Sequence, residues 1–255
     1  MNSGRAALYI GLLLIVSLIS GCMYVRLLKL KAQLSDFDKY FELRDEQKLT
    51  MIFLDPVLLN DDIVWLLKSD PISREETEMG ELWTYVFEKQ YTGTKDEKGD
   101  FDIPLDMLFH KKKLKEVRFP ERFLKYLSKP LLAKMFRSMG DAEISKLSRT
   151  VDSEFKGNNP LEIPSKAQII ELLGSPFSVE DSDGKSEFTY KYKVKETTPS
   201  SSKEEFRLTT KFVFQQGSDK LLKAEGNLNG LLDMTMDFSV DGSGIRKNSD
   251  ESNTN

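Results

Sequence analysis

The sequence predicts an α+β protein built from two tandem units, each a helix packed on a small antiparallel sheet, joined by a helical segment. Three observations support this prediction. Two stretches of the chain resemble each other at a spacing of about 105 positions. Runs of alternating apolar and polar residues follow each stretch and predict half-buried strands. Between the two stretches, residues 120–147 carry a broad apolar stripe at helical spacing.

Composition sets the broad class of the protein. The chain has 255 residues, of which 39% are hydrophobic, enough for an ordinary core. One cysteine and one histidine exclude a disulfide framework, a thiolate zinc site and a histidine metal cluster. Because 37 basic residues face 41 acidic ones, the net charge of −4 does not indicate a nucleic-acid binder. We therefore expect no metal, no cofactor and no nucleic-acid partner.

Residues 1–21 have the pattern of a lipoprotein signal peptide. Arg5 precedes an uncharged apolar run, and small residues stand before the only cysteine. The segment Ile19-Ser20-Gly21-Cys22 resembles a bacterial lipobox, in which the cysteine thiol attacks a diacylglycerol donor. The resemblance implies that Cys22 carries a lipid and that membrane lipid is one partner of the protein. Met23, rather than aspartate, follows the cysteine, which implies sorting to the outer membrane, facing the periplasm.

Two other interpretations of the start remain open. Residues 6–25 lack charge and are long enough to span a bilayer, which would make a single-pass inner-membrane anchor. Cys22 would otherwise be a buried free thiol. Within the expected anchor and amphipathic segment, residues 22–48, leucines recur at helical spacing between basic residues. That helix lies near the headgroups or packs on its own domain.

The first unit is expected over residues 49–119. It begins with a strand over 49–54, followed by a helix that Asn60 and Asp61 cap. Alternation then predicts strands around 83–87, 105–109 and 113–117, with a polar loop between the first two. Trp65 on the helix and Trp83 on a strand are expected in the core.

The second unit is expected over residues 159–240. Ser165 is a suitable N-cap for its helix, while Gly174 and Pro176 end it. Aromatic residues alternate with polar ones over 188–192, and the turn at 216–219 joins two strands of a hairpin. Residues 231–240 add a further strand. A helical linker, 120–158, joins the units, with Pro130 separating two short helices, and a disordered tail, 241–255, follows them.

At the second unit the chain resembles the BamE/SmpA-type small lipoproteins. The residues concerned run from Ile163 to Pro176, with Leu173-Gly174-Ser175-Pro176 at the helix end, followed by Phe188-Thr189-Tyr190 and a hairpin. Residues 161–226 carry the resemblance well and residues 56–118 more weakly, since the first copy has Lys68 where the glycine would stand. These lipoproteins assist the assembly of outer-membrane barrel proteins, so the resemblance implies an envelope location and an envelope protein partner.

One basic segment is a candidate contact surface. Residues 111–137 hold ten basic side chains and only two acidic ones, so they are suited to anionic headgroups or an acidic partner. A solvated face is the alternative interpretation. The candidate residues for this face are Lys111, Lys112, Lys113, Arg122, Lys125 and Lys129.

We find no catalytic constellation in the sequence and expect no enzyme. No serine or cysteine nucleophile is matched with His110 as its base, and no phosphate-binding loop or nucleophile elbow is present. The expected function is a non-catalytic binding or assembly module, anchored to the membrane. The alternative is a tethered carrier or sensor for a lipid or peptide. A large dry pocket would favour the carrier, and a filled core with exposed edge strands would favour the binding module.

Overall fold

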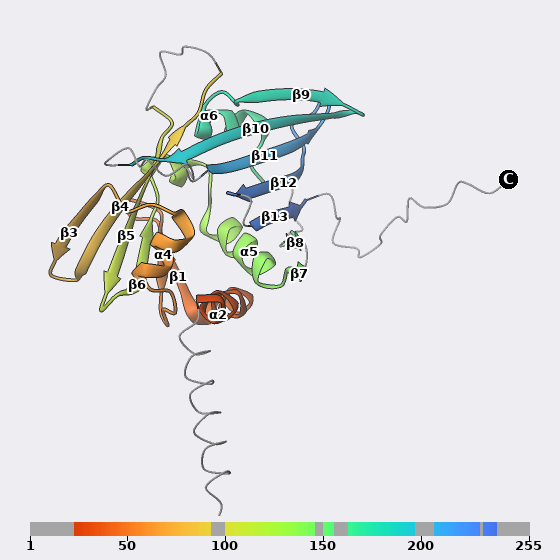
Figure 1. Ribbon diagram of the computed structural model, residues 1–255. Helices are drawn as coiled ribbons and strands as arrows, with labels where there is room; N and C mark the ends of the chain where they lie inside the picture. Colours follow the sequence, from red (N-terminus) through yellow and green to blue (C-terminus); the bar gives the residue numbers. More distant parts are fainter. Residues whose placement is uncertain are drawn as a thin grey trace, which may run out of the picture.

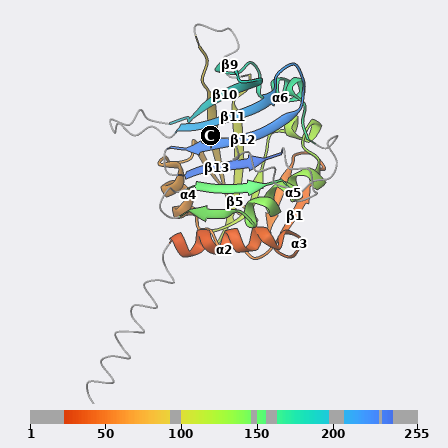
Figure 2. The same ribbon diagram turned by 90° about the vertical axis from the view of Figure 1, so that its right-hand side faces the viewer.

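The computed structural model describes residues 23–92, 100–145, 150–155, 163–196, 207–229 and 232–238. Their strands form one 13-stranded sheet in the order β1-β2-β6-β5-β4-β10-β11-β12-β13-β8-β7, with β3 beside β4 and β9 beside β10. Every pairing is antiparallel except that of β13 with β8. Figures 1 and 2 show this sheet as the main body of the molecule.

The elements occupy the following residues. The helices are α2 (Met23–Ser35), α3 (Phe37–Tyr40), α4 (Asn60–Leu67), the 3-10 helix η1 (Glu121–Lys125), α5 (Lys129–Gly140) and α6 (Lys166–Leu173). The first strands are β1 (Phe41–Arg44), β2 (Thr50–Phe53), β3 (Ser73–Thr77), β4 (Gly80–Lys89), β5 (Ile103–His110) and β6 (Lys113–Arg118). The later strands are β7 (Glu143–Ser145), β8 (Thr150–Glu154), β9 (Ser178–Ser182), β10 (Lys185–Val194), β11 (Arg207–Gln215), β12 (Leu221–Leu228) and β13 (Leu232–Asp237).

The prediction of two separate helix-on-sheet units is wrong. Strands β4 and β10 extend beyond their short neighbours β3 and β9, and they pair directly with each other. Lys89 lies opposite Tyr192, and Phe87 lies opposite Val194. An edge strand presents unpaired backbone groups, so two such edges on one chain satisfy each other by pairing. The result is one large sheet with few helices, in place of two small sheets.

The expected helical linker is also only partly helical. Within 120–158 the helices are η1 and α5, and Pro130 lies in the first turn of α5 as the sequence indicates. Strands β7 and β8 follow and join the sheet, β8 lying parallel to β13. The linker therefore contributes to the sheet itself.

Two helices show how local sequence sets the boundaries. Ser165 caps α6 as predicted, accepting a bond from the Gln168 N–H, and Gly174 follows the helix with φ +74°. The cap of α4 lies one residue before the predicted caps, Asn60 and Asp61. Leu59 occupies the cap position, and its N–H donates to the Asp62 carboxylate at 2.8 Å. Lys68 ends α4 in the left-handed conformation that glycine usually takes.

Helices α2, α3 and α5 contact one another, and Figure 2 shows them together in the lower part of the molecule. Helix α5 packs on α2 and contacts both β1 and β8, which lie near opposite ends of the strand order. Gly140 allows the close approach of α5 to α2, because a Cβ there would lie 2.1 Å from the Ser35 nitrogen. One continuous core cluster includes residues of the sheet and of these helices.

The expected amphipathic segment packs partly on its own domain. Leu34 of α2 is buried, and Leu27 and Leu30 pack against the core, whereas Tyr24 and Leu28 are exposed. Among the described residues, no helix has the length and apolarity needed to cross a membrane. Cys22, the predicted signal peptide 1–21 and the predicted tail 241–255 lie outside the described residues.

Candidate functional site

The six basic residues predicted as one face lie at separate places in the fold. Lys111, Lys112 and Lys113 form the exposed turn between β5 and β6, where the first two have positive φ angles of 49° and 67°. Arg122, Lys125 and Lys129 follow the other end of β6. Because a strand rises about 3.3 Å per residue, β6 holds the two groups roughly 20 Å apart.

The second group binds other parts of the protein. Arg122 is half-buried and donates to the carbonyls of Phe101, Asp102 and Leu172, and burial lowers its pKa. Lys125 donates to the Glu171 carboxylate, a hydrogen bond that raises the pKa of the lysine. Arg122 thereby ties the loop before β5 to the end of α6.

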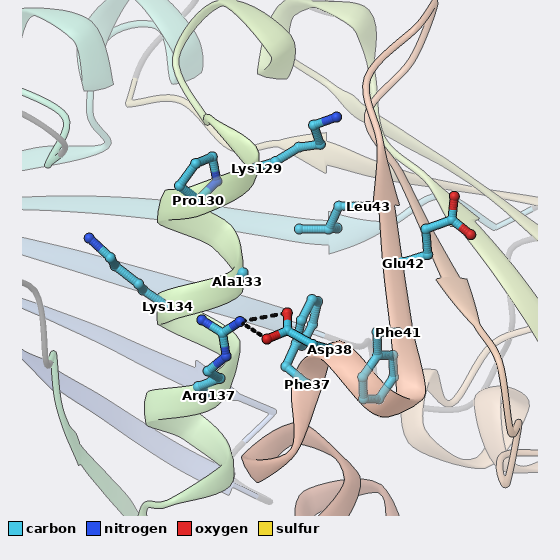
Figure 3. A pocket seen from close by; sticks show the side chains of 10 residues that line it. All are labelled: Phe37, Asp38, Phe41, Glu42, Leu43, Lys129, Pro130, Ala133, Lys134 and Arg137. Atoms are coloured by element: carbon cyan, nitrogen blue, oxygen red, sulfur yellow. Dashed lines mark hydrogen bonds and ion pairs between the residues drawn. The ribbon is translucent and has the colours of Figure 1, made fainter.

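One hollow of the described surface lies between α5 and the first edge of the sheet. It has a volume of about 530 Å³ and is open to solvent. Residues of α3, β1 and α5 line it, and Lys129 of the predicted face is among them. The lining residues are Phe37, Asp38, Phe41, Glu42, Leu43, Lys129, Pro130, Ala133, Lys134 and Arg137. Figure 3 shows Leu43 lying between β1 and α5, whereas Glu42 points away from the helix.

Strand β1 has free backbone groups at the edge of the sheet beside this groove. The Leu54 N–H donates to the Tyr40 oxygen, and the register places Phe41 opposite Phe53. In an antiparallel pair bonded positions alternate, so the backbone of Glu42 faces β2 and that of Leu43 faces away. The Leu43 N–H and C=O therefore lie at the free edge of the sheet, without a partner among the described residues, while the Leu43 side chain points toward α5.

Charged residues form the rim of the groove over an apolar floor. Arg137 of α5 binds the Asp38 carboxylate through one guanidinium nitrogen, at 2.6 Å to Oδ1. Lys129 lies 3.0 Å from Asp45, beyond the other end of β1. The floor between them is made by Phe37 and Phe41, both buried. These two ion pairs connect α5 to the elements on the facing side of the groove.

Both acidic side chains that line the groove are paired with arginines: Asp38 with Arg137, and Glu42 with Arg44. The bond to Arg44 lowers the pKa of Glu42, whose side chain points away from α5. His110 lies elsewhere, with Nδ1 3.2 Å from the Met79 oxygen. Within the described ranges, no group of three or more His, Cys, Asp or Glu residues is placed to hold a metal ion.

Sequence reasoning missed the residues at the junction of β4 and β10. Lys89 is buried, its Nζ donates to the Leu173 oxygen at the end of α6, and the rings of Tyr91, Phe101 and Tyr190 lie about it at 5.0–5.3 Å. A cation at a helix C-terminus is favourable because the helix dipole is negative there. Lys89 continues the alternation of Tyr85 and Phe87 on the buried face of β4, so its place in that alternation was the available signal, although lysine is usually exposed.

The groove residues were also missed, except Lys129. The spacing of Phe37 and Phe41 roughly continues the helical stripe of the leucines before them, yet Phe37 begins the separate helix α3 and Phe41 begins β1. The short spacing of Asp36 and Asp38 before an apolar alternation was the available signal for this break. Comparisons of the chain with family models, curated proteins and solved structures found no match.

Proposed function

We propose that this protein is a non-catalytic binding module of the cell envelope, anchored at its N-terminus, that takes an extended segment of a partner protein into the groove beside β1. The observation that carries the proposal is the backbone of Leu43, whose N–H and C=O face away from β2 at the free edge of the sheet, beside the groove that Leu43 lines. A peptide that adds as a strand satisfies such groups with its own main chain. A lipid tail would leave them unpaired.

The distribution of apolar side chains also favours a binding module over a carrier. The side chains of the sheet and of α2, α5 and α6 join in one core cluster, and the groove is open at the surface. A carrier needs an enclosed apolar space for its ligand. An extended peptide needs only a free edge, an apolar floor and a rim that orients it, and the groove has all three.

The anchor remains the lipidated Cys22 that the lipobox resemblance implies. Metabolic labelling with a fatty acid, in the presence and absence of globomycin, tests it directly. Labelling of the natural chain that is abolished in Cys22→Ser supports the anchor. Labelling that persists in Cys22→Ser would show that the lipobox interpretation is wrong.

Binding of an extended peptide is tested with the full chain in detergent and a phage-displayed library of linear peptides as the probe. We expect selected peptides to slow hydrogen exchange at the Leu43 amide and to lose affinity about tenfold or more in Leu43→Pro, which removes the free N–H. Proline is tolerated at an outward-facing edge position, so the fold should persist. Leu43→Ala, which keeps the N–H, is the control.

Two results would contradict the groove proposal. One is a set of selected peptides that bind Leu43→Pro as well as they bind Leu43→Ala. The other is peptide binding that leaves hydrogen exchange of β1 unchanged. Either result places peptide binding away from the β1 edge, while the Cys22 experiment still decides the anchor separately.

A further inference from the structure

We propose that the start of α2, the exposed side of α4 and the turns beside them form a second membrane contact that binds anionic phospholipid and fixes how the anchored protein stands on the bilayer. The inference rests on the proposed attachment of the N-terminus to a membrane. We call this region the α2–α4 surface. Its residues are Tyr24, Leu28, Lys29, Trp65, Lys68, Met79, Lys111, Lys112 and Lys113.

Exposed apolar side chains gather on this surface. Tyr24 is 64% exposed and Trp65 40%, and their rings make an edge-to-face contact at 6.2 Å between centroids. Leu28 lies one turn along α2 from Tyr24, and it is also exposed. Tyrosine and tryptophan combine an apolar ring with a polar group, a combination that is enriched at membrane–water interfaces.

Backbone contacts bring the lysine turn to the same place. The Asn60 N–H, at the start of α4, donates to the Lys112 oxygen at 2.9 Å. The imidazole of His110 meets the Met79 oxygen, so the exposed Met79 lies beside this turn. Figure 1 shows α2 and the ends of β5 and β6 on the same lower side of the molecule.

The positive charge of this surface is not neutralised internally. Its five lysines are exposed, and none has an ion-pair partner among the described residues. The Lys68 ammonium lies over the Trp65 ring at 4.4 Å, which leaves its charge available. The exposed acidic residues in the same elements and turns are Asp61, Asp70, which pairs with Arg74, and Glu75, Glu76 and Glu78 at β3 and the turn after it. Lysines near an anionic leaflet each strengthen binding by about fivefold.

The closeness of this surface to the proposed anchor indicates that its partner is the bilayer. Helix α2 begins at Met23, the residue after the proposed lipid attachment at Cys22. Leu28 lies only about 8 Å further along the helix. A lipid at Cys22 therefore holds Tyr24 and Leu28 at headgroup depth, where aromatic rings and lysines are both favoured. The ion pair of Arg26 with Asp62 fixes α4 against this part of α2.

Trp65 reports on the contact directly. The full chain is placed in vesicles of phosphatidylcholine and phosphatidylglycerol that carry a shallow spin-labelled lipid. We expect the label to quench tryptophan fluorescence in the natural chain and not in Trp65→Phe, because the remaining Trp83 is 3% exposed. Replacing phosphatidylglycerol by phosphatidylcholine should weaken the quenching.

Charge reversal with a matched control completes the test. The double variant Lys111→Glu with Lys112→Glu should lower the equilibrium constant for contact between the α2–α4 surface and the bilayer by about 25-fold or more. Lys185→Glu with Lys220→Glu changes the same charge at exposed turns in the upper part of the sheet and should leave quenching unchanged (Figures 1 and 2). Flotation of the vesicles reports anchoring in each sample independently of Trp65.

Two outcomes would overturn the inference. If the shallow label does not quench Trp65 in vesicles that float with the protein attached, a protein or solvent covers this surface instead of the bilayer. Equal quenching in the two charge-reversed proteins would show that the lysine turn does not contribute. A protein that fails to float contradicts the proposed anchor, and with it the membrane contact that depends on it.

Discussion

Arg26 of α2 and Asp62 of α4 form a two-point ion pair, with Nε 2.7 Å from Oδ2 and Nη2 2.5 Å from Oδ1. The Asp62 side chain is 3% exposed and also accepts from the Leu59 N–H at the start of α4. One carboxylate therefore starts a helix and holds it against α2. This contact links the first described element of the chain to the body of the protein.

Removing one partner of this ion pair should cost much of the stability. We expect Arg26→Ala to lower the free energy of unfolding by about 3–5 kcal/mol, because it leaves the Asp62 charge buried without its cation. Arg44→Ala breaks the exposed pair with Glu42 and should cost less than about 1 kcal/mol. Urea unfolding of both variants measures the difference. Equal losses in the two variants would show that the Arg26 pair contributes no more than a surface pair.

Gly174 is expected to tolerate no side chain. A Cβ there would lie 2.6 Å from a ring carbon of Phe101 and 2.7 Å from the Lys89 ammonium, and φ is +74°. Gly174→Ala should therefore cost more than Gly184→Ala, which has a similar φ of +71° but open space around the Cβ. We expect about 1 kcal/mol for Gly184→Ala and at least about 2–3 kcal/mol for Gly174→Ala. Thermal unfolding of the pair tests it, and similar melting temperatures would contradict it.

Three buried tyrosines should make the fold sensitive to alkali. Burial raises the pKa of Tyr85, Tyr190 and Tyr192 above the ordinary value of 10.0. Above about pH 10 the unfolded chain loses these protons while the folded protein keeps them, so stability is present below that pH and falls as the pH rises. Each tyrosine contributes at most about 1.4 kcal/mol per pH unit. Denaturant unfolding between pH 8 and 11 measures the loss.

Tyr192→Phe gives a specific form of this prediction. The Tyr192 hydroxyl is buried with no hydrogen-bond partner among the described residues. Removing it should leave stability unchanged or raise it at pH 7, and should reduce the alkaline loss. Tyr190→Phe is the control, because the Tyr190 hydroxyl donates to the Gly174 oxygen at 3.1 Å and its removal should destabilise the protein at pH 7. A larger loss at pH 7 in Tyr192→Phe than in Tyr190→Phe would contradict this account.

The continuous sheet should unfold as one body. Trp83→Ala and Tyr190→Ala remove large buried side chains from the two ends of the region that joins β4 to β10. Each should lower stability by about 3–5 kcal/mol. Both belong to one core cluster, so calorimetry should show a single transition that each variant shifts. Two transitions, each shifted by only one variant, would favour independent folding units instead.

Local features of the fold were predictable from the sequence, and long-range pairings were not. Ser165 and Gly174 mark the ends of α6, and the turn after Gln215 separates β11 from β12. These signals act within a few residues. The pairing of β4 with β10 depends on which edges remain free after every hairpin has formed, and alternation within either strand does not contain that information.

The groove could not be predicted from the sequence for a related reason. Strand β8, with the sequence Thr150-Val151-Asp152-Ser153-Glu154, lacks a continuous apolar face, so its place in the sheet was not predicted. The groove depends on α5 crossing from β8 to β1. The prediction placed residues 41–44 in the anchor and amphipathic segment rather than in a strand, so the free edge of β1 could not be recognised.

The parallel pairing of β8 with β13 has a consequence for biosynthesis. Thr150 lies opposite Asp233, so β8 must wait for a partner made more than 80 residues later. During that interval β8 lacks its neighbour β13, and once β12 is made its outer edge stays open to other chains until β13 follows. A chain whose synthesis or export stalls just before residue 232 therefore exposes the free edge of β12 and is prone to aggregate. A chaperone that shields such edges would be needed most at that stage.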